Sequence, residues 1–180
     1  LSMNRAELAQ RIAKTAILHG DFTLRSGRKS TWYIDKYLFT TKPDILTELG
    51  ALFSEKIPQT ATLLAGAELG GIPLVTTASM ATNLPCIFIR NQKKEYGTSK
   101  QLEGKLSNTD KVVIVEDIAT TGGQVLEAAK TIQELGATVV SIIAVIDRCE
   151  GARENVESAG FVFDSLFTTV DLGINEVSTK

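Results

Sequence analysis

Residues 112–124, with the sequence VVIVEDIATTGGQ, constrain the possible fold of this chain more than any other segment does. Four consecutive β-branched residues are typical of a strand that is buried on both faces of a sheet. Two adjacent carboxylates, Glu116 and Asp117, follow, and a small-residue turn leads into a helical pattern from Val125. In an open α/β sheet, ligands bind at the carboxyl ends of the strands. The order of strand, acidic pair, turn and helix therefore predicts a ligand site at this strand end.

The turn after the acidic pair suits a phosphate group. The first backbone N–H groups of a helix have no partner within the helix and bind anions readily, and Thr120 and Thr121 add two hydroxyls. The segment has neither the lysine of a nucleoside-triphosphate loop nor a Gly-x-Gly-x-x-Gly pattern, which excludes both of those phosphate-binding loops. The residues alone leave open an ordinary connection in which Thr and Gly only cap and turn the chain.

Helical and strand patterns alternate along the rest of the chain. Apolar residues at helical spacing predict helices over residues 4–19, 43–56, 73–82, from 125 onward, and 151–158. Short apolar runs predict a hairpin over residues 21–35 and strands over residues 60–65, 85–90, 112–116, 137–146 and 161–167. Strands that alternate with helices predict an α/β fold with a mostly parallel sheet and right-handed crossovers.

Composition narrows the class of protein. The chain has 180 residues, 43% of them hydrophobic, and a formal charge of −2, which argues against general nucleic-acid binding. No apolar stretch approaches the length of a membrane span and no signal-peptide pattern opens the sequence. Cys86 and Cys149 lack metal-ligand spacing and are expected to be reduced packing residues. We therefore expect a cytoplasmic enzyme that contacts neither nucleic acid nor membrane.

Two further strand ends carry unusual residues. Residues 67–73 (AELGGIP) contain the pair Gly70 and Gly71, which lets backbone approach a ligand closely, although a tight strand-to-helix turn has the same composition. Residues 91–104 form a polar loop that is long for a compact domain and, with Arg90, carries several cations. Such a loop suits an anionic leaving group. When it closes over the site, its cations stabilise the developing negative charge and the loop excludes water. On composition alone, it is equally a solvated surface loop.

A hairpin and an arginine complete the set of candidates. Residues 22–35 (FTLRSGRKSTWYID) combine cations, hydroxyls and aromatic rings, which suits an anionic planar base, although composition alone also fits an edge hairpin with its aromatics in the core. Arg148 follows the predicted strand 137–146. An arginine at a strand end can hold a carboxylate by two parallel hydrogen bonds. A surface arginine without a special task is the alternative.

Residues 112–124 closely resemble the phosphoribosyl diphosphate (PRPP) motif of the type I phosphoribosyltransferases. That resemblance implies the type I phosphoribosyltransferase fold, as one domain over residues 1–180, in which about residues 1–40 contribute a small N-terminal hood over the base. It assigns the acidic pair to the ribose hydroxyls, the following turn to the 5′-phosphate and the glycine pair at residues 70–71 to pyrophosphate. The implied PRPP-binding residues are Glu116, Asp117, Ile118, Ala119, Thr120, Thr121, Gly122, Gly123, Gln124, Gly70 and Gly71.

Three segments resemble the orotate phosphoribosyltransferases in particular. The hairpin matches their signature Leu-(Lys/Arg)-Ser-Gly-Arg-x-Ser, which places Arg25, Tyr33 and Ile34 at the base, and the matching Asp-Arg places Arg148, together with Thr120, on orotate. The basic loop resembles their mobile catalytic loop, which implies catalytic roles for Arg90, Lys94 and Tyr96, beside Asp117.

The chain departs from that family at three positions. Gly70 stands where orotate enzymes often have lysine, so pyrophosphate contacts there would be mostly backbone and the missing charge would come from elsewhere. Asn91 replaces a frequent lysine, and Tyr96 stands where some relatives have histidine, which disfavours a histidine acid–base step. The single histidine, His19, falls in the first predicted helix and is expected to be structural.

The resemblance implies an orotate phosphoribosyltransferase reaction: PRPP and orotate give orotidine 5′-monophosphate and pyrophosphate in de novo pyrimidine synthesis. Mg²⁺ is implied as a cofactor bound mainly through PRPP, with no ligand expected directly from the protein. A homodimer whose basic loop reaches the neighbouring site is implied as well. The alternatives are a relative that uses another base, against which Arg25 and Arg148 argue, and a non-catalytic PRPP-sensing regulator, against which the intact acidic pair and the basic loop argue.

Overall fold

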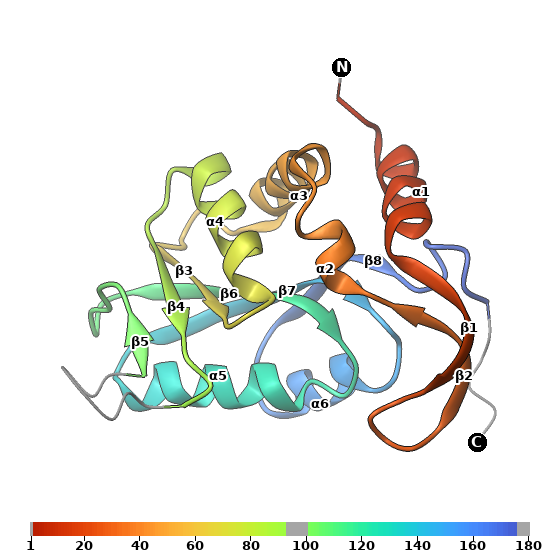
Figure 1. Ribbon diagram of the computed structural model, residues 1–180. Helices are drawn as coiled ribbons and strands as arrows, with labels where there is room; N and C mark the ends of the chain where they lie inside the picture. The colour runs from red at the N-terminus through yellow and green to blue at the C-terminus, as the bar shows by residue number, and fades with distance from the viewer. Residues whose placement is uncertain (1, 93–100, 176–180) are drawn as a thin grey trace.

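A six-stranded sheet forms the centre of the molecule (Figure 1). The computed structural model describes residues 2–92 and 101–175. Adjacent strands of the sheet are, in spatial order, β5 (Leu102–Glu103), β4 (Cys86–Ile89), β3 (Leu63–Ala67), β6 (Lys111–Ala119), β7 (Thr138–Asp147) and β8 (Phe163–Thr168). All neighbouring pairs are parallel except β4 and β5. The expected α/β fold with a mostly parallel sheet is thus confirmed.

Helices cover both faces of this sheet (Figure 1). Helices α3 (Pro43–Lys56) and α4 (Gly71–Thr82) lie on one face, and α5 (Gly123–Glu134) and α6 (Ala152–Ser158) lie on the other. Successive side chains of a strand point to opposite faces, so Val113 and Val115 of β6 join the core under α3 and α4, whereas Val112 and Ile114 join the core under α5. Burial on both faces explains the unbroken apolar run at the start of β6.

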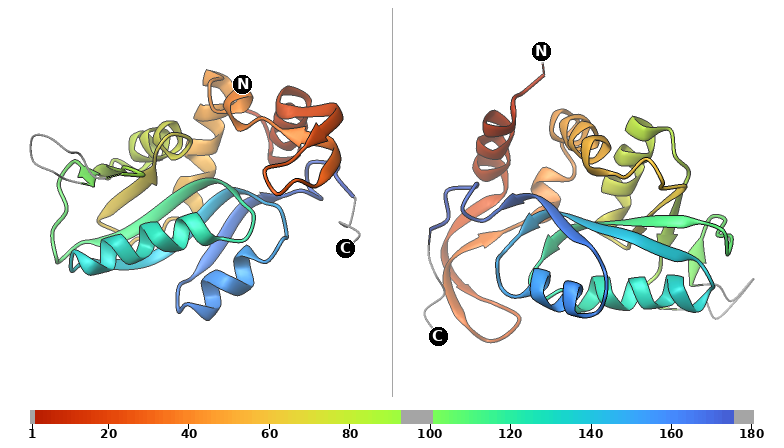
Figure 2. Two further views of the ribbon diagram at one scale, coloured as in Figure 1. Left: turned by 60° about the horizontal axis from the view of Figure 1, so that its bottom comes forward. Right: turned by 180° about the vertical axis from the view of Figure 1, so that it is seen from behind.

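The N-terminal segment forms a small N-terminal layer whose buried residues join the core under α3 and α4. Helix α1 (Arg5–Ala16), which is capped by Asn4 and Glu7, leads into an antiparallel hairpin of β1 (Ile17–Thr23) and β2 (Lys29–Ile34), and the short helix α2 (Lys36–Phe39) follows. The hairpin lies beside the carboxyl ends of strands β6 and β7 (Figures 1 and 2). The backbone N–H of Asp35 donates to the Ala16 carbonyl at 2.9 Å, which ties α2 to the end of α1. The hairpin is thereby fixed over the strand ends.

Several element boundaries differ from the sequence-based expectation. The first helix ends at Ala16, so the prediction that His19 is helical was wrong: Ile17 adopts an extended conformation and pairs with Ile34. Strand β6 continues to Ala119 rather than ending at 116, because Ile118 and Ala119 pair with Ile146 and Asp147 of β7. Helix α4 begins at Gly71 rather than at 73, and α2 and β5 were not predicted. None of the helices in the described ranges is long and apolar enough to cross a membrane.

Candidate active site

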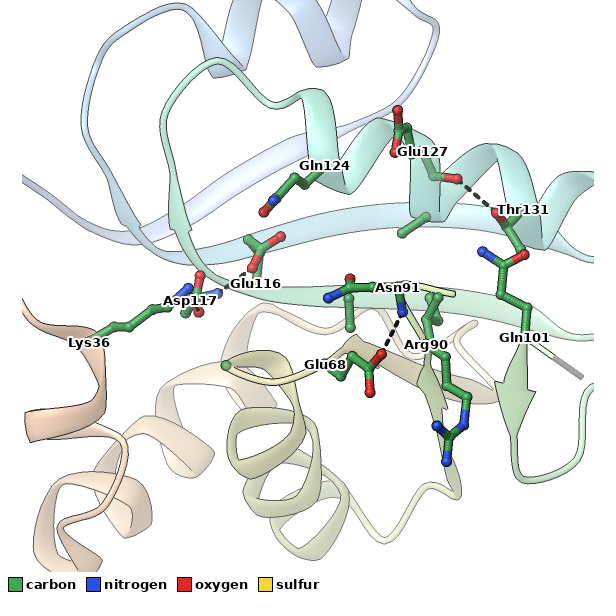
Figure 3. A pocket seen from close by; sticks show the side chains of 14 residues that line it. Lys36, Glu68, Arg90, Asn91, Gln101, Glu116, Asp117, Gln124, Glu127 and Thr131 are labelled. Carbon is green, nitrogen blue, oxygen red and sulfur yellow. Dashed lines mark hydrogen bonds and ion pairs between the residues drawn. The ribbon is translucent and has the colours of Figure 1, made fainter. Parts of the chain in front are cut away.

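The acidic pair lies near the end of β6, in the middle of the edge where the parallel strands end (Figure 3). Asp117 is 3% exposed, and its two carboxylate oxygens have different partners. Its Oδ1 accepts a hydrogen bond from the backbone N–H of Ile118 at 2.6 Å, and its Oδ2 lies 2.8 Å from the Nζ atom of Lys36. The side chain of Lys36 extends from α2 toward Asp117 (Figure 3). A residue of the N-terminal layer therefore neutralises the buried carboxylate.

The two acids differ in their electrostatic surroundings. Burial, followed by the negative charge of Asp117, raises the pKa of Glu116 from 4.5 to about 8. Burial lowers the pKa of Lys36, but the hydrogen bond and the negative charge of Asp117 outweigh it, and the net pKa is raised above 10.5. At neutral pH, Glu116 is thus predominantly protonated, while Lys36 and Asp117 form an ion pair. A ribose presented to this pair would meet one hydrogen-bond donor and one strong acceptor.

The turn between β6 and α5 presents backbone N–H groups. Gly122 has a φ of +84°, and a Cβ atom there would lie 3.1 Å from Val156 Cγ2, so both conformation and space favour glycine. The side chain of Asn155 fixes the turn by donating to the Thr121 carbonyl at 2.8 Å. Among the described residues, no side chain caps the start of α5 at Gly122. The uncapped helix start is therefore available to an anion such as the 5′-phosphate.

A cavity of about 660 Å³ joins three segments that are far apart in the sequence. Its lining includes the hairpin residues Arg25, Tyr33 and Ile34, the turn over residues 118–125, and Arg148. Tyr33 is 44% exposed and its ring centroid lies 5.8 Å from that of Phe22, whereas Ile34 is buried. The structure thus brings the residues expected at the base and those expected at the 5′-phosphate around one space.

Arg148 is held by residues that the sequence analysis did not single out. Its guanidinium carbon lies 4.7 Å from the centroid of the Trp32 ring, and its Nη2 atom lies 3.4 Å from Glu150 Oε1. Glu150 also pairs with Arg28 at 3.4 Å, which links the hairpin to the end of β7. The Nε atom of Arg148 is buried without a hydrogen-bond partner among the described residues. A carboxylate of a ligand would satisfy this orphaned donor.

A second cavity, of about 220 Å³, lies on the other side of the acidic pair. The loop between β3 and α4 contributes Glu68 and Gly70, and the end of β4 contributes Arg90 and Asn91 (Figure 3). The backbone N–H of Asn91 donates to Glu68 Oε1 at 2.7 Å, which ties the two loops together. A Cβ atom on Gly66 would lie 2.5 Å from the Gly71 carbonyl oxygen. The close packing of β3 and α4 therefore requires glycine and presents the loop backbone to this cavity.

The expected catalytic loop is described only in part. Arg90 lines the smaller cavity, but its Nε atom donates to Glu103 Oε1 at 2.8 Å. Lys94 and Tyr96 lie outside the described residues. No group of three or more His, Cys, Asp or Glu side chains within residues 2–92 and 101–175 is arranged to hold a metal ion.

Sequence reasoning missed Lys36, Trp32 and Glu150. Trp32 belongs to the hairpin over residues 22–35, but only Arg25, Tyr33 and Ile34 of that hairpin were predicted to contact the base. Lys36 directly follows that hairpin, and the lysine missing at Gly70 was a signal that a cation had to come from another segment. Nothing in the sequence indicated that Lys36 would meet Asp117, which is 81 positions later, because that contact depends on how the hairpin docks.

Comparison with known proteins gives similarity over nearly the whole chain. Residues 39–177 match the family model of the phosphoribosyl transferase domain. An orotate phosphoribosyltransferase of Haloquadratum walsbyi is 41% identical over 161 residues, which are 89% of this chain and 87% of that protein. The Mycobacterium tuberculosis orotate phosphoribosyltransferase in complex with Fe(III) dicitrate has a TM-score of 0.85 at 31% identity, covering 94% of this chain and 99% of that one. The M. tuberculosis enzyme in complex with PRPP has a TM-score of 0.79 at 30% identity, with the same coverage of both chains.

Proposed function

Since this chain belongs to the orotate phosphoribosyltransferase family, we propose that the two cavities on either side of its acidic pair form the active site. The enzyme transfers the phosphoribosyl group of PRPP to orotate and releases orotidine 5′-monophosphate and pyrophosphate, a step of pyrimidine synthesis. One observation carries the site assignment: the larger cavity joins the base-binding hairpin, the uncapped start of α5 and Arg148. The assignment of individual residues that follows is our proposal.

PRPP would lie across the acidic pair. The 5′-phosphate is expected at the turn over residues 120–124, where the uncapped start of α5 offers N–H groups. The ribose hydroxyls would meet Glu116 and Asp117 at the boundary of the two cavities. The diphosphate would then extend into the smaller cavity, toward the backbone of Gly70 and Gly71 at the start of α4.

Orotate would enter the larger cavity between the hairpin and the strand ends. Its carboxylate fits Arg148, whose Nε atom is a buried donor without a partner among the described residues. The Trp32 ring holds the guanidinium in place from one side, and Tyr33 and Arg25 close the cavity from the hairpin. A neutral base such as uracil or adenine has no carboxylate for Arg148, so this arrangement favours orotate.

The proposed reaction path is dissociative. The bond between the anomeric carbon and pyrophosphate breaks, and its electron pair leaves with pyrophosphate as the sugar gains oxocarbenium character. The orotate nitrogen attacks the same carbon and gives up its N–H proton, which the departing pyrophosphate can accept. Asp117 would hold the ribose hydroxyls in place, and cations in the smaller cavity would stabilise the departing pyrophosphate. Arg90 would exchange Glu103 for pyrophosphate, and Lys94 and Tyr96 are proposed to act beside it.

We propose Mg²⁺ as the cofactor, bound mainly through PRPP. The smaller cavity suits such a complex because Glu68, Asp117 and Glu127 line it with carboxylate oxygens, the ligands that Mg²⁺ prefers. Mg²⁺ commonly keeps several waters and binds through substrate phosphates rather than a cage of side chains. When bound, it would neutralise charge on the diphosphate.

We also propose a cytoplasmic homodimer in which residues of the basic loop reach the neighbouring subunit's site. Family resemblance supports this proposal. Sedimentation velocity should give a dimer mass. Mixing a Lys94→Ala variant with an Arg148→Ala variant should restore activity if the loop acts across the interface, whereas activity that stays at the sum of the separate variants would contradict a shared site.

The activity is tested by the loss of orotate absorbance after mixing the protein with PRPP, Mg²⁺ and orotate. Parallel reactions would contain uracil, adenine or hypoxanthine in place of orotate. Consumption of orotate alone is the expected result. Consumption of another base would keep the PRPP site but refute the assignment of Arg25 and Arg148, and binding of PRPP without consumption of any base would favour a regulator.

A further inference from the structure

A side chain at Gly70 would displace the carboxylate of Asp117, which occupies the space in front of it. A Cβ atom at Gly70 would collide with Asp117 Oδ2, and it would lie 3.4 Å from Lys36 Cε. Lys36 itself reaches this position from α2, at the other side of the site (Figure 3). At position 70, the loop between β3 and α4 therefore supplies backbone only, and Lys36 from the N-terminal layer contacts that position.

The smaller cavity needs a cation if it is to hold a diphosphate. Its charged lining consists of the carboxylates of Glu68, Asp117 and Glu127, with Lys36 and Arg90 as the cations among the described residues, whereas Glu116 is predominantly protonated. Arg90 is already paired with Glu103 through its Nε atom. A diphosphate placed among carboxylates would be repelled unless a cation stood beside it.

Lys36 stands at the boundary of the two cavities. The residues that line both of them are Lys36, Glu116, Gln124 and Glu127, and Lys36 is the cation of this group. An ammonium group has three N–H donors, and one of these suffices for Asp117 Oδ2. Two donors remain for a ligand, and the side chain is 35% exposed, so a ligand can reach it.

From this geometry we propose that Lys36 binds the diphosphate of PRPP, and the pyrophosphate product, in place of the side chain that Gly70 lacks. The inference rests on the proposed function, because it assumes that PRPP lies across the acidic pair. In this arrangement Lys36 bridges Asp117 and the diphosphate without leaving its partner. It also lies two residues after Ile34, so one short segment carries contacts to both substrates.

The test separates a diphosphate contact from support of Asp117. Lys36→Met keeps a long apolar side chain and removes the charge, and Lys36→Arg keeps the charge. Binding of PRPP, pyrophosphate with Mg²⁺, and ribose 5-phosphate would be measured by calorimetry for each protein. Ribose 5-phosphate has the sugar and the 5′-phosphate but no diphosphate. Lys42→Met is the matched control, because Lys42 is an exposed lysine six positions away.

We expect Lys36→Met to weaken PRPP and pyrophosphate binding by about tenfold or more, as for loss of a charge-assisted contact, and to change ribose 5-phosphate binding by less than about twofold. Lys36→Arg should recover most of the PRPP affinity, and Lys42→Met should behave like the wild type. Equal weakening of PRPP and ribose 5-phosphate would overturn the inference, since Lys36 would then only support Asp117. Unchanged PRPP binding would overturn it as well.

The same measurements distinguish failure of this inference from failure of the proposed function. Failure of the wild-type protein to bind PRPP would refute the function itself. A wild-type protein that binds PRPP, together with a Lys36→Met variant that binds it equally well, would refute only the role of Lys36. If Lys36→Met does not fold, Lys36→Gln takes its place, because glutamine also removes the charge and is more polar: a normal affinity for ribose 5-phosphate with a weakened affinity for pyrophosphate supports the contact, and unaltered affinity for both opposes it.

Discussion

Replacement of Glu116 by glutamine should change the pH dependence of stability in a way that the structure quantifies. The pKa of Glu116 is raised from 4.5 to about 8 by burial and by the charge of Asp117. Between these two values the folded protein holds a proton that the unfolded chain has released. The free energy of unfolding therefore falls as pH rises from about 4.5 to about 8, and this loss levels off above the folded-state pKa. Glutamine at position 116 has no proton to lose, so this dependence disappears in the variant.

The expected size follows from the linkage relation. The slope reaches about 1.4 kcal/mol per pH unit while the folded state is protonated and the unfolded state is not. It decreases near the folded-state pKa, so integration from about pH 6 to about pH 8 gives roughly 2 kcal/mol. The stability of Glu116→Gln relative to the wild type should therefore rise by about 2 kcal/mol over this interval.

Urea unfolding at three pH values, with constant ionic strength and without ligand, measures this difference. The exposed carboxylate of Glu127 lines the same cavities, so Glu127→Gln is the matched control, and its unfolding free energy should run parallel to that of the wild type. The reasoning is refuted if the wild type and Glu116→Gln lose stability in parallel between about pH 6 and about pH 8, because Glu116 would then already be ionised in the folded protein.

Three further substitutions test the rest of the site. Asp117→Asn removes the charge that pairs with Lys36 and should weaken PRPP binding by about tenfold or more in calorimetry, with little change in thermal stability; unaltered affinity would contradict the ribose assignment. Arg148→Ala should raise the orotate KM by roughly tenfold or more, since a charge-assisted bidentate contact is worth about 1.5–3 kcal/mol, and an equal rise in the PRPP KM would argue against a specific carboxylate contact. Gly122→Ala should lower the unfolding free energy by about 1–2 kcal/mol, because the new Cβ atom meets Val156 at a φ of +84°, and unchanged thermal melting would refute that strain.

The fold could be predicted from the sequence because its signals are local. The apolar run in β6, the proline at the start of α3 and the regular alternation of strands and helices each arise within one short segment. The misplaced boundaries have a different cause, which is pairing with another segment of the chain. Ile17 leaves the helical pattern because it finds a partner in Ile34, and the β6 pairing extends past the acidic pair because β7 is long enough to continue it. Pairing between segments decided both cases, and periodicity within one segment does not show it.

The candidate site likewise combines groups that are contiguous in sequence with partners that come from distant segments. The acidic pair, the turn and the start of α5 are contiguous in sequence, so their positions followed once the strand and the helix were placed. The partners of these groups come from elsewhere: Lys36 meets Asp117 and Trp32 meets Arg148 only because the hairpin docks over the strand ends. These contacts set the charge state of the acidic pair and the orientation of Arg148.

The glycine at position 70 shows why a motif alone gives an incomplete account of such a site. Taken by itself, the loop over residues 67–73 lacks a cation and suggests a weakened pyrophosphate site. In three dimensions, the absence of a side chain at Gly70 leaves room for the carboxylate of Asp117, with which Lys36 pairs. A lysine introduced at position 70 would collide with Asp117, so the two positions cannot both carry the cation without rearrangement. The positive charge required near the diphosphate must therefore be sought in the whole cavity. A different segment of the chain can supply that cation for the same reaction.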